Sequence, residues 1–164
     1  MRRIVICDTG PLLHLSEANA INLLHLAGEV IIPPVVAKEF KRNAPDAKLP
    51  DWVRVKDLDD AYVKKALGWS KQIDVGEAAA IALTLQEQAE WLLSDDAKAR
   101  QFAESLGLEV HGSIGLLLWG VAERHIGSRD DALSLLNALT DSSLWISDRV
   151  LRQARKAIDT FFSE

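Results

Sequence analysis

The sequence predicts an α/β fold, a three-layer α/β/α sandwich around a central, mainly parallel sheet of four to five strands. Two observations support this prediction. Short, continuous apolar runs such as residues 4–7 (Ile-Val-Ile-Cys) are rich in β-branched side chains, which is typical of strands buried on both faces. Helical patterns separate these runs, and strands that alternate with helices form parallel sheets covered by helices on both faces.

In the first half of the chain, prolines and glycines mark where the elements begin and end. Pro11 follows the first apolar run closely, and proline is well tolerated in the first turn of a helix. A break near Asn19 divides the following apolar pattern into two helices, and Gly28 stops the second. The expected elements are a strand at 4–7, two short helices before residue 28, a strand at 30–32, a helix from residue 34 through 40, a loop at 42–51, a strand at 52–55 and a helix at 59–67.

The second half begins with an alanine-rich segment, residues 77–83, which follows Gly76 and is apolar nearly all round. Such a helix belongs in the interior or against the sheet. We further expect a strand at 91–93, a helix at 96–106 stopped by Gly107, a strand at 108–110 and only helices afterwards. The last segment is apolar enough to predict a surface that is covered by the same chain, a second copy or a partner. Its apolar residues are Leu133, Leu135, Leu136, Leu139, Leu144, Trp145, Ile146, Val150 and Leu151.

The composition is that of a globular protein, because 48% apolar and 26% charged residues exclude a disordered chain. With 164 residues we expect one domain that spans residues 1–164. The net charge of −5 disfavours nonspecific binding to duplex DNA, although bound metal ions would reverse the field at a small site. The single cysteine, Cys7, allows no disulfide within the chain, so we expect a cytoplasmic protein, and no apolar run is long enough to predict a membrane span.

Carboxylates stand at or beside the ends of the predicted strands. Asp8 follows the first strand, and the pair Asp95 and Asp96 follows a later one. Ligands bind at the carboxyl edge of open α/β sheets, so we expect these side chains to lie together. Glu39 and Glu77 lie on helices next to strands. Because oxygen ligands suit Mg²⁺ or Mn²⁺, the pattern leads to the hypothesis of a metal site.

Each acid also has a purely structural interpretation. Asp8 is a good helix N-cap, although Thr9 is equally suited to that role. Glu39 taken alone would be a solvated helix charge, and Glu77 would complement the dipole of its helix. Asp74 is the better cap for the helix that contains Glu77. The joint placement of the acids, and no single one of them, therefore carries the hypothesis.

The residues around Asp95 and Asp96 add a second group of candidates. One of the two acids would cap the next helix while the other points into the cleft. Asp96 and Arg100 also have the i,i+4 spacing of a surface salt bridge. Ser94, at the same strand end, would position a water molecule or a phosphate oxygen. A zinc site is not expected, because the four histidines have no ligand spacing, and the five tryptophans are more typical of core or interface positions than of base stacking.

The blocks that contain these acids resemble a PIN-like domain. They read Asp-Thr-Gly-Pro-Leu at residues 8–12, Ile-Ile-Pro-Pro-Val-Val at 31–36 with Glu39, Gly-Glu-Ala-Ala-Ala-Ile-Ala-Leu at 76–83, and Leu-Ser-Asp-Asp at 93–96 with Arg100. More narrowly they resemble a prokaryotic branch related to the VapBC-type toxin ribonucleases. The resemblance covers about residues 3–125 as the core, followed by a C-terminal helical extension at about 128–162.

The resemblance implies a metal-dependent endoribonuclease with Mg²⁺ or Mn²⁺ in an acidic cluster. Asp8, Glu39, Glu77 and Asp96 match the catalytic acids, with Glu77 in place of the more usual Asp. The metal would be held by Asp8, Glu77 and Asp96, with Asp95 as the second choice for the last position. Substrate-positioning roles fall to Thr9, Ser94 and Arg100. The implied partners are RNA, a small antitoxin protein and a second copy in a homodimer.

Two alternatives belong to other functional classes. The first is a catalytically inactive PIN-like fold that acts as a protein-interaction module. The second is a phosphoacceptor receiver, which would need an acceptor aspartate at a middle strand and a lysine at a late strand end. Asp57 is a marginal acceptor, and residues 108–111 (Leu-Glu-Val-His) contain no lysine, which counts against a receiver.

Overall fold

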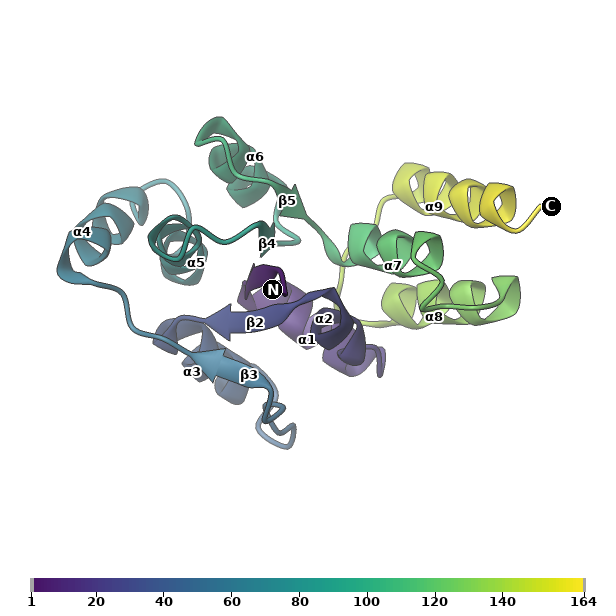
Figure 1. Cartoon of the computed structure of the whole chain (residues 1–164), viewed down its shortest axis with the longest axis horizontal. Helices are drawn as coiled ribbons and strands as arrows, with labels where there is room; N and C mark the ends of the chain where they lie inside the picture. Colours follow the sequence, from purple (N-terminus) through teal and green to yellow (C-terminus); the bar gives the residue numbers. More distant parts are fainter. Residues whose placement is uncertain (1, 164) are drawn as a thin grey trace.

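The computed structural model describes residues 2–163 and has a five-stranded, all-parallel sheet at its centre (Figure 1). The strand order is β3-β2-β1-β4-β5, so the chain first builds the sheet outward on one side of β1 and then crosses to the other side. This confirms the predicted α/β/α architecture. The strands are β1 (Ile4–Cys7), β2 (Glu29–Ile32), β3 (Val53–Val55), β4 (Trp91–Leu93) and β5 (Val110–His111).

The three inner strands are buried on both faces, as their apolar runs predict. Along β1, Val5 and Cys7 pack into one hydrophobic core while Ile6 between them packs into the other. The same alternation holds in β4, where Leu93 and Leu92 face opposite cores. Side chains alternate along a strand, so a run without polar residues is needed to fill both cores.

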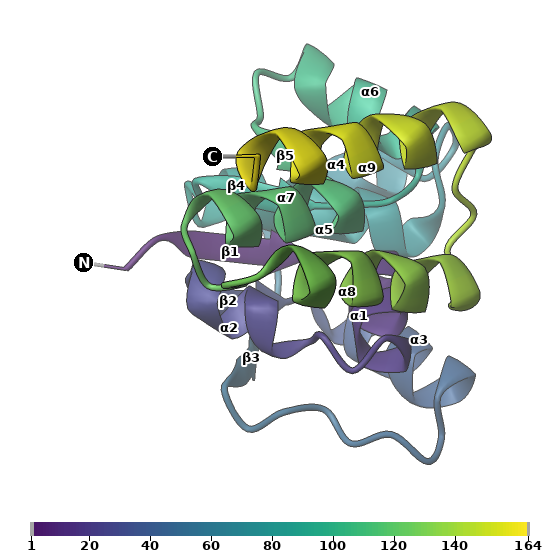
Figure 2. The ribbon, with the colours of Figure 1, turned by 90° about the vertical axis from the view of Figure 1, so that its right-hand side faces the viewer.

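Helices cover the two faces of the sheet, with α4 to α6 on one side and the remaining helices on the other (Figures 1 and 2). None of the helices in residues 2–163 is long and apolar enough to cross a membrane. The helices are α1 (Thr9–Glu17), α2 (Asn22–Ala27), α3 (Pro34–Asn43), α4 (Asp60–Trp69), α5 (Val75–Gln86), α6 (Ala97–Ser105), α7 (Ser113–Ala122), α8 (Arg129–Asp141) and α9 (Asp148–Phe161).

The element boundaries follow the predictions with one clear error. The break between α1 and α2 lies at Asn19, which adopts the left-handed conformation with φ of 56°. The sequence predicts the last strand at residues 108–110, but the strand pairs at Val110 and His111. Leu108 instead donates its N–H to the Ala103 carbonyl and completes the end of α6, so an apolar run alone places the strand too early. The other expected bounds shift by one to three residues, with the largest differences at the ends of α3 and α5.

The C-terminal helices are covered mainly by their own chain. Figure 2 shows α7, α8 and α9 lying side by side, and α8 also packs against α1. Leu136 and Leu139 on α8 are completely buried in this packing. Of the apolar residues named for this segment, Trp145 and Val150 remain exposed, at 84% and 40%. Trp145 is therefore the most exposed side chain of that set.

Candidate active site

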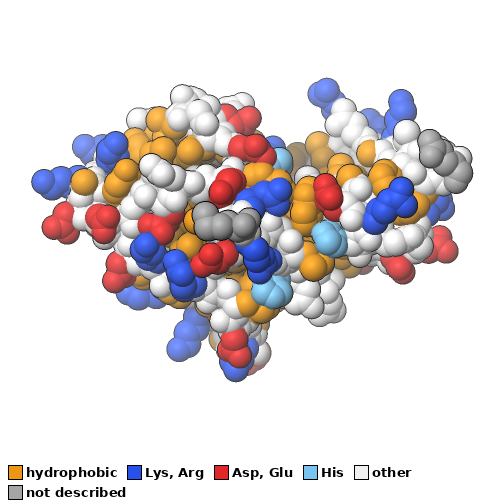
Figure 3. All heavy atoms as spheres, in the orientation of Figure 1, with side chains coloured by type: hydrophobic (Ala, Val, Ile, Leu, Met, Phe, Trp, Pro, Cys, Tyr) orange, Lys and Arg blue, Asp and Glu red, His pale blue; other side chains and the backbone are white. Residues whose placement is uncertain are grey.

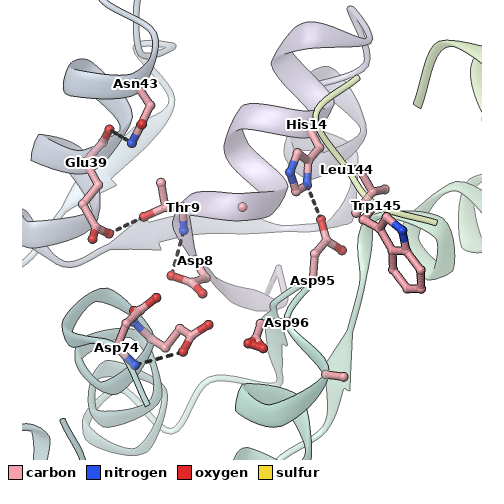
Figure 4. A pocket seen from close by; sticks show the side chains of 13 residues that line it. Asp8, Thr9, His14, Glu39, Asn43, Asp74, Asp95, Asp96, Leu144 and Trp145 are labelled. Carbon is pink, nitrogen blue, oxygen red and sulfur yellow. Dashed lines mark hydrogen bonds and ion pairs between the residues drawn. The ribbon is translucent and has the colours of Figure 1, made fainter. Parts of the chain in front are cut away.

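The predicted acids meet at the carboxyl edge of the sheet, between β1 and β4. Asp8 directly follows β1, and its N–H donates to the carbonyl of Leu93 at the end of β4 at 2.9 Å. The strand order reverses between these two strands, which is where open α/β sheets bind ligands. A cavity of about 520 Å³ opens there (Figure 4). Its lining residues are Asp8, Thr9, Gly10, His14, Glu39, Asn43, Asp74, Glu77, Asp95, Asp96, Ala97, Leu144 and Trp145.

Asp8 is both the N-cap of α1 and the most buried acid of the cavity, at 6% exposure. Its Oδ1 accepts a hydrogen bond from the Thr9 N–H at 2.8 Å, so Asp8 takes the capping role for which Thr9 was the alternative. Burial raises the pKa of Asp8 to about 8, the Thr9 N–H opposes this rise, and the carboxylates of Glu77, Asp74 and Glu39 add to it. The charged form of Asp8 is therefore costly unless a cation joins the cluster.

Glu39 reaches the cavity from α3 and is held by two neighbours. Its Oε1 accepts a hydrogen bond from the Thr9 hydroxyl at 2.6 Å. On the other side the carboxylate lies against the backbone of Gly76 in α5, where an added Cβ would stand 3.0 Å from the Glu39 Cδ and closer still to Oε1. Gly76 thus leaves the space that the Glu39 carboxylate fills.

Glu77 enters the cavity from the first turn of α5 and forms a capping box with Asp74. The Glu77 N–H donates to Asp74 Oδ1 at 2.8 Å, and the Asp74 N–H donates to Glu77 Oε1 at 3.1 Å. Burial raises the pKa of Glu77 to about 7, the Asp74 N–H opposes the rise, and the carboxylates of Asp74 and Asp96 add to it. A capping box uses Glu at this third helical position, which accounts for Glu where the resemblance expects Asp.

The adjacent acids after β4 have separate roles, but Asp96 combines the two tasks, capping a helix and facing the cleft, that the sequence analysis divided between them. Asp96 is the N-cap of α6, with Oδ1 accepting from the Lys98 N–H at 3.3 Å, and its exposed side chain turns toward the other acids in Figure 4. Asp95 turns the other way. It accepts hydrogen bonds from the N–H and the hydroxyl of Ser113, both at 2.6 Å, and contacts His14 Nδ1 at 2.7 Å. Both oxygens of Asp95 are therefore already engaged.

The two remaining substrate-positioning candidates lie behind and beside the cluster. Ser94 is 2% exposed, shares a small hollow with Asp8 and Glu77, and its Oγ has no hydrogen-bond partner among the described residues. Arg100 lines a neighbouring cavity and not the acidic one. The Asp96–Arg100 ion pair that the spacing suggested is not formed within residues 2–163.

The carboxylates share a cavity, but they do not stand in the geometry of a ready-made metal site. Among residues 2–163, no three side chains of His, Cys, Asp or Glu converge closely enough to hold an ion. Instead α1, α5 and α6 begin around the cavity, so their positive N-terminal ends offset part of the repulsion. The donor set nevertheless fits a hard cation, because it consists of carboxylates and the unpartnered, buried Ser94 Oγ.

Two residues that line the cavity, and one that lies behind Glu39, escape the sequence analysis as site residues. Asp74 is recognised there only as a cap, Gly76 only as a residue before a helix, and His14 only as a scattered histidine. His14 is distinguished by its contact with Asp95, since the other three histidines pack against tryptophan rings. His14 could have been recognised in the sequence from its position one helical turn after Gly10, on the helix face that meets the cavity. Asp57, the receiver-type acceptor, follows the edge strand β3 and does not line the cavity.

Comparison with known families agrees with this geometry. The chain matches the family model DUF3368, which is described as a PIN domain, over residues 4–160. The match includes α8 and α9 and so extends well beyond residues 3–125, to which the sequence resemblance was confined. No curated protein matches the chain.

Proposed function

This chain belongs to the PIN-domain family, whose members are generally nucleases, and from that premise we propose that it is a divalent-metal-dependent endoribonuclease. The observation that carries the proposal is the common cavity of Asp8, Glu39, Glu77 and Asp96 at the reversal point of the sheet. Four carboxylates that face one solvent-accessible space repel one another, and Mg²⁺ or Mn²⁺ is the partner that relieves this repulsion.

In this proposal Asp8, Glu77 and Asp96 hold the metal. When bound, such an ion stabilises the charge on the attacking and leaving oxygens of a phosphodiester and lowers the pKa of a bound water. Asp8 and Glu77 are buried beside each other, so their raised pKa values fall as soon as a cation pairs with them. Ser94 Oγ supplies a further oxygen at the base of the site.

The remaining residues orient water and substrate. The Thr9 hydroxyl holds one oxygen of Glu39, which leaves the second oxygen to accept a proton from the attacking water. Asp95, which is itself held by Ser113, fixes the ring of His14 through Nδ1, so that Nε2 is left for a phosphate oxygen. Asp95 then acts by positioning His14, and Asp96 takes the ligand role at this strand end.

Cleavage of a labelled single-stranded RNA of mixed sequence tests the proposal. We expect cleavage by the wild type with MnCl₂ or MgCl₂, none after addition of EDTA, and a loss of at least a hundredfold in the variant Asp8→Asn. Asp59→Asn serves as a matched control, because Asp59 caps α4 outside the cavity. Equal cleavage by the wild type and Asp8→Asn overturns the site. An inactive interaction module predicts neither cleavage nor any effect of the metal.

The finer part of the proposal concerns partners. We propose that RNA is the substrate, that the protein acts in the cytoplasm as the toxin of a toxin–antitoxin pair, and that it forms a homodimer. Exposed apolar side chains support a covered surface, since Val63 and Leu67 lie one turn apart on α4 at 40% and 65% exposure, and Val75 at the start of α5 is 60% exposed.

Two experiments test these partners separately. Co-expression with the neighbouring reading frame should yield a co-purifying small protein that suppresses RNA cleavage. Light scattering should give twice the monomer mass, and Leu67→Lys should reduce it to the mass of one chain. A monomeric wild type contradicts the dimer and leaves the nuclease assignment to the cleavage assay.

A further inference from the structure

One tryptophan differs from all the others in its surroundings. Trp145, in the connection between α8 and α9, is 84% exposed. The other four pack against rings, with Trp52 on His25, Trp69 on Phe102, and Trp91 and Trp119 on each other. An indole is costly to expose to water, so a bare one next to a cavity points to a ligand that covers it.

Trp145 stands where the acidic cavity meets a second one. The second cavity has a volume of about 220 Å³ and shares Asp95, Ala97, Leu144 and Trp145 with the acidic cavity. Figure 4 shows Trp145 beside Asp95, at the opposite end of the acidic cavity from Glu39. Whatever covers the indole is therefore directly next to the carboxylates.

The second cavity contains a cation that has no direct ion-pair partner. Arg100 lines it, and its guanidinium forms no ion pair among residues 2–163. An added Cβ on Gly112 would lie 2.8 Å from Arg100 Nη1, so the absence of a side chain there leaves room for the guanidinium. The remaining lining is largely apolar and includes Ile114, Ile146 and Val150. A flat aromatic face, a guanidinium and an apolar wall together suit an unpaired nucleobase.

The charge of the adjoining helix favours the same ligand. Helix α9 begins three residues after Trp145, and Arg149, Arg152 and Lys156 lie on one of its faces at i, i+3 and i+7 spacing, all exposed. Lys and Arg side chains project from this end of the molecule at the upper right of Figure 3, whereas the rest of that face carries both signs interspersed. In a chain of net charge −5, α9 is thus a local basic segment next to the indole.

We propose that Trp145 and the adjoining cavity form a subsite for an unpaired base of single-stranded nucleic acid, one nucleotide away from the phosphate at the acidic cavity. The inference rests on the proposed nuclease function, because it concerns the substrate of that same site. The base stacks on the indole, Arg100 contacts its edge or the neighbouring phosphate, and α9 follows the backbone. Paired bases are already stacked within a duplex, so the subsite selects single strands.

Binding measured without cleavage tests the subsite. The background is Asp8→Asn, and the probe is a fluorescein-labelled 12-nucleotide RNA of mixed sequence, followed by fluorescence anisotropy. Stacking on one aromatic side chain strengthens binding roughly tenfold or more per base. Adding Trp145→Ala should therefore raise the Kd for the RNA by about that factor. Trp145→Phe should stay within about threefold, because Phe keeps a stacking surface. Leu26→Ala, which removes another exposed apolar side chain, one outside both cavities, should have no effect.

Several outcomes overturn the subsite. The subsite is contradicted if Trp145→Ala leaves the Kd unchanged or if the protein binds no RNA at all. It is also contradicted if the same RNA, annealed to its complement as a duplex, binds with equal affinity. A change in oligomeric mass with unchanged Kd assigns the indole to a protein contact instead. The nuclease proposal fails independently: if the wild type cleaves no RNA while Trp145→Ala still weakens binding, the subsite stands and the catalytic assignment falls. If the wild type cleaves RNA but its binding does not depend on Trp145, the catalytic assignment stands and the subsite falls.

Discussion

Replacement of Asp8 by Asn is the most direct test of the carboxylate cluster. Burial raises the pKa of Asp8 from its ordinary value of 3.8 to about 8, so the folded protein keeps a proton that the unfolded chain releases. The stability that this proton contributes is fully present below about pH 4 and is lost as the pH rises through about 8. Asn has the same shape without the charge, and its side-chain oxygen still accepts from the Thr9 N–H. We expect metal-free Asp8→Asn to be more stable than the wild type at pH 8.

The size of the effect is clearest between pH 7 and pH 8. Burial raises the pKa of Glu77 only to about 7, so most of the loss in this window belongs to Asp8. One such group changes the free energy of unfolding by about 1 kcal/mol per pH unit. In a protein of this length that corresponds to about 2–4 °C in Tm. A metal present at a hundredfold excess over its Kd opposes the loss with roughly 3 kcal/mol.

Thermal unfolding measures how the Tm depends on pH and on the metal. The wild type, Asp8→Asn and the control Asp59→Asn are compared at pH 6, 7 and 8, each in EDTA and in MnCl₂. We expect the wild-type Tm in EDTA to fall from pH 7 to pH 8, and MnCl₂ to raise it. Asp8→Asn should show a flat profile in that window and almost no response to MnCl₂, whereas Asp59→Asn should follow the wild type. A less stable Asp8→Asn at pH 8, or one that MnCl₂ still stabilises fully, refutes the reasoning.

Three further substitutions separate the roles of neighbouring residues. Gly76→Ala should displace the Glu39 carboxylate and lower the cleavage rate at least tenfold. The free energy of unfolding should stay equal or rise by up to about 1 kcal/mol, because Ala favours the helix more than Gly does. Full cleavage activity in Gly76→Ala contradicts the argument that Gly76 makes room for Glu39. Ser94→Ala removes a buried hydroxyl without a partner and should stabilise the metal-free protein by about 1 kcal/mol in urea unfolding. The same variant should respond less to MnCl₂, and an unchanged response removes Ser94 from the site. Asp95→Asn should lower the free energy of unfolding by about 1–3 kcal/mol, because His14 and Ser113 lose a charged hydrogen-bond partner. If Asp95→Asn also abolishes the rise in Tm that MnCl₂ causes, Asp95 is a metal ligand.

The sequence predicts the sheet and the meeting of the acids for a physical reason. Strands buried on both faces need apolar runs, and the carboxyl ends of parallel strands share one edge, so Asp8 and Asp96 had to approach each other. It does not predict contacts that depend on how side chains from distant elements pack. The space that Gly76 leaves for Glu39, and the contact of His14 with Asp95 across 81 positions, are of this kind.

The split between Asp95 and Asp96 shows the same limit at a single strand end. The sequence suggests that one acid caps the next helix while the other points into the cleft, but Asp96 does both, since it caps α6 and turns toward the other acids. Which one is free for the cavity depends on where α7 begins, since the Ser113 N–H and hydroxyl occupy Asp95. The start of α7, eighteen positions later, is not encoded in the local pattern.

The capping roles of the acids also determine which residues would change if a protein with this fold lost its catalytic activity during evolution. Asp8, Asp74 and Asp96 each begin a helix, and Glu77 completes a capping box, so a descendant without the proposed nuclease activity would still be selected to keep all four for its folding. Glu39 begins no helix, and among residues 2–163 its carboxylate accepts a hydrogen bond only from a threonine hydroxyl. In related chains, the presence of the four capping acids therefore indicates only that the fold is kept. The presence or absence of the glutamate on α3 should distinguish active enzymes from inactive ones.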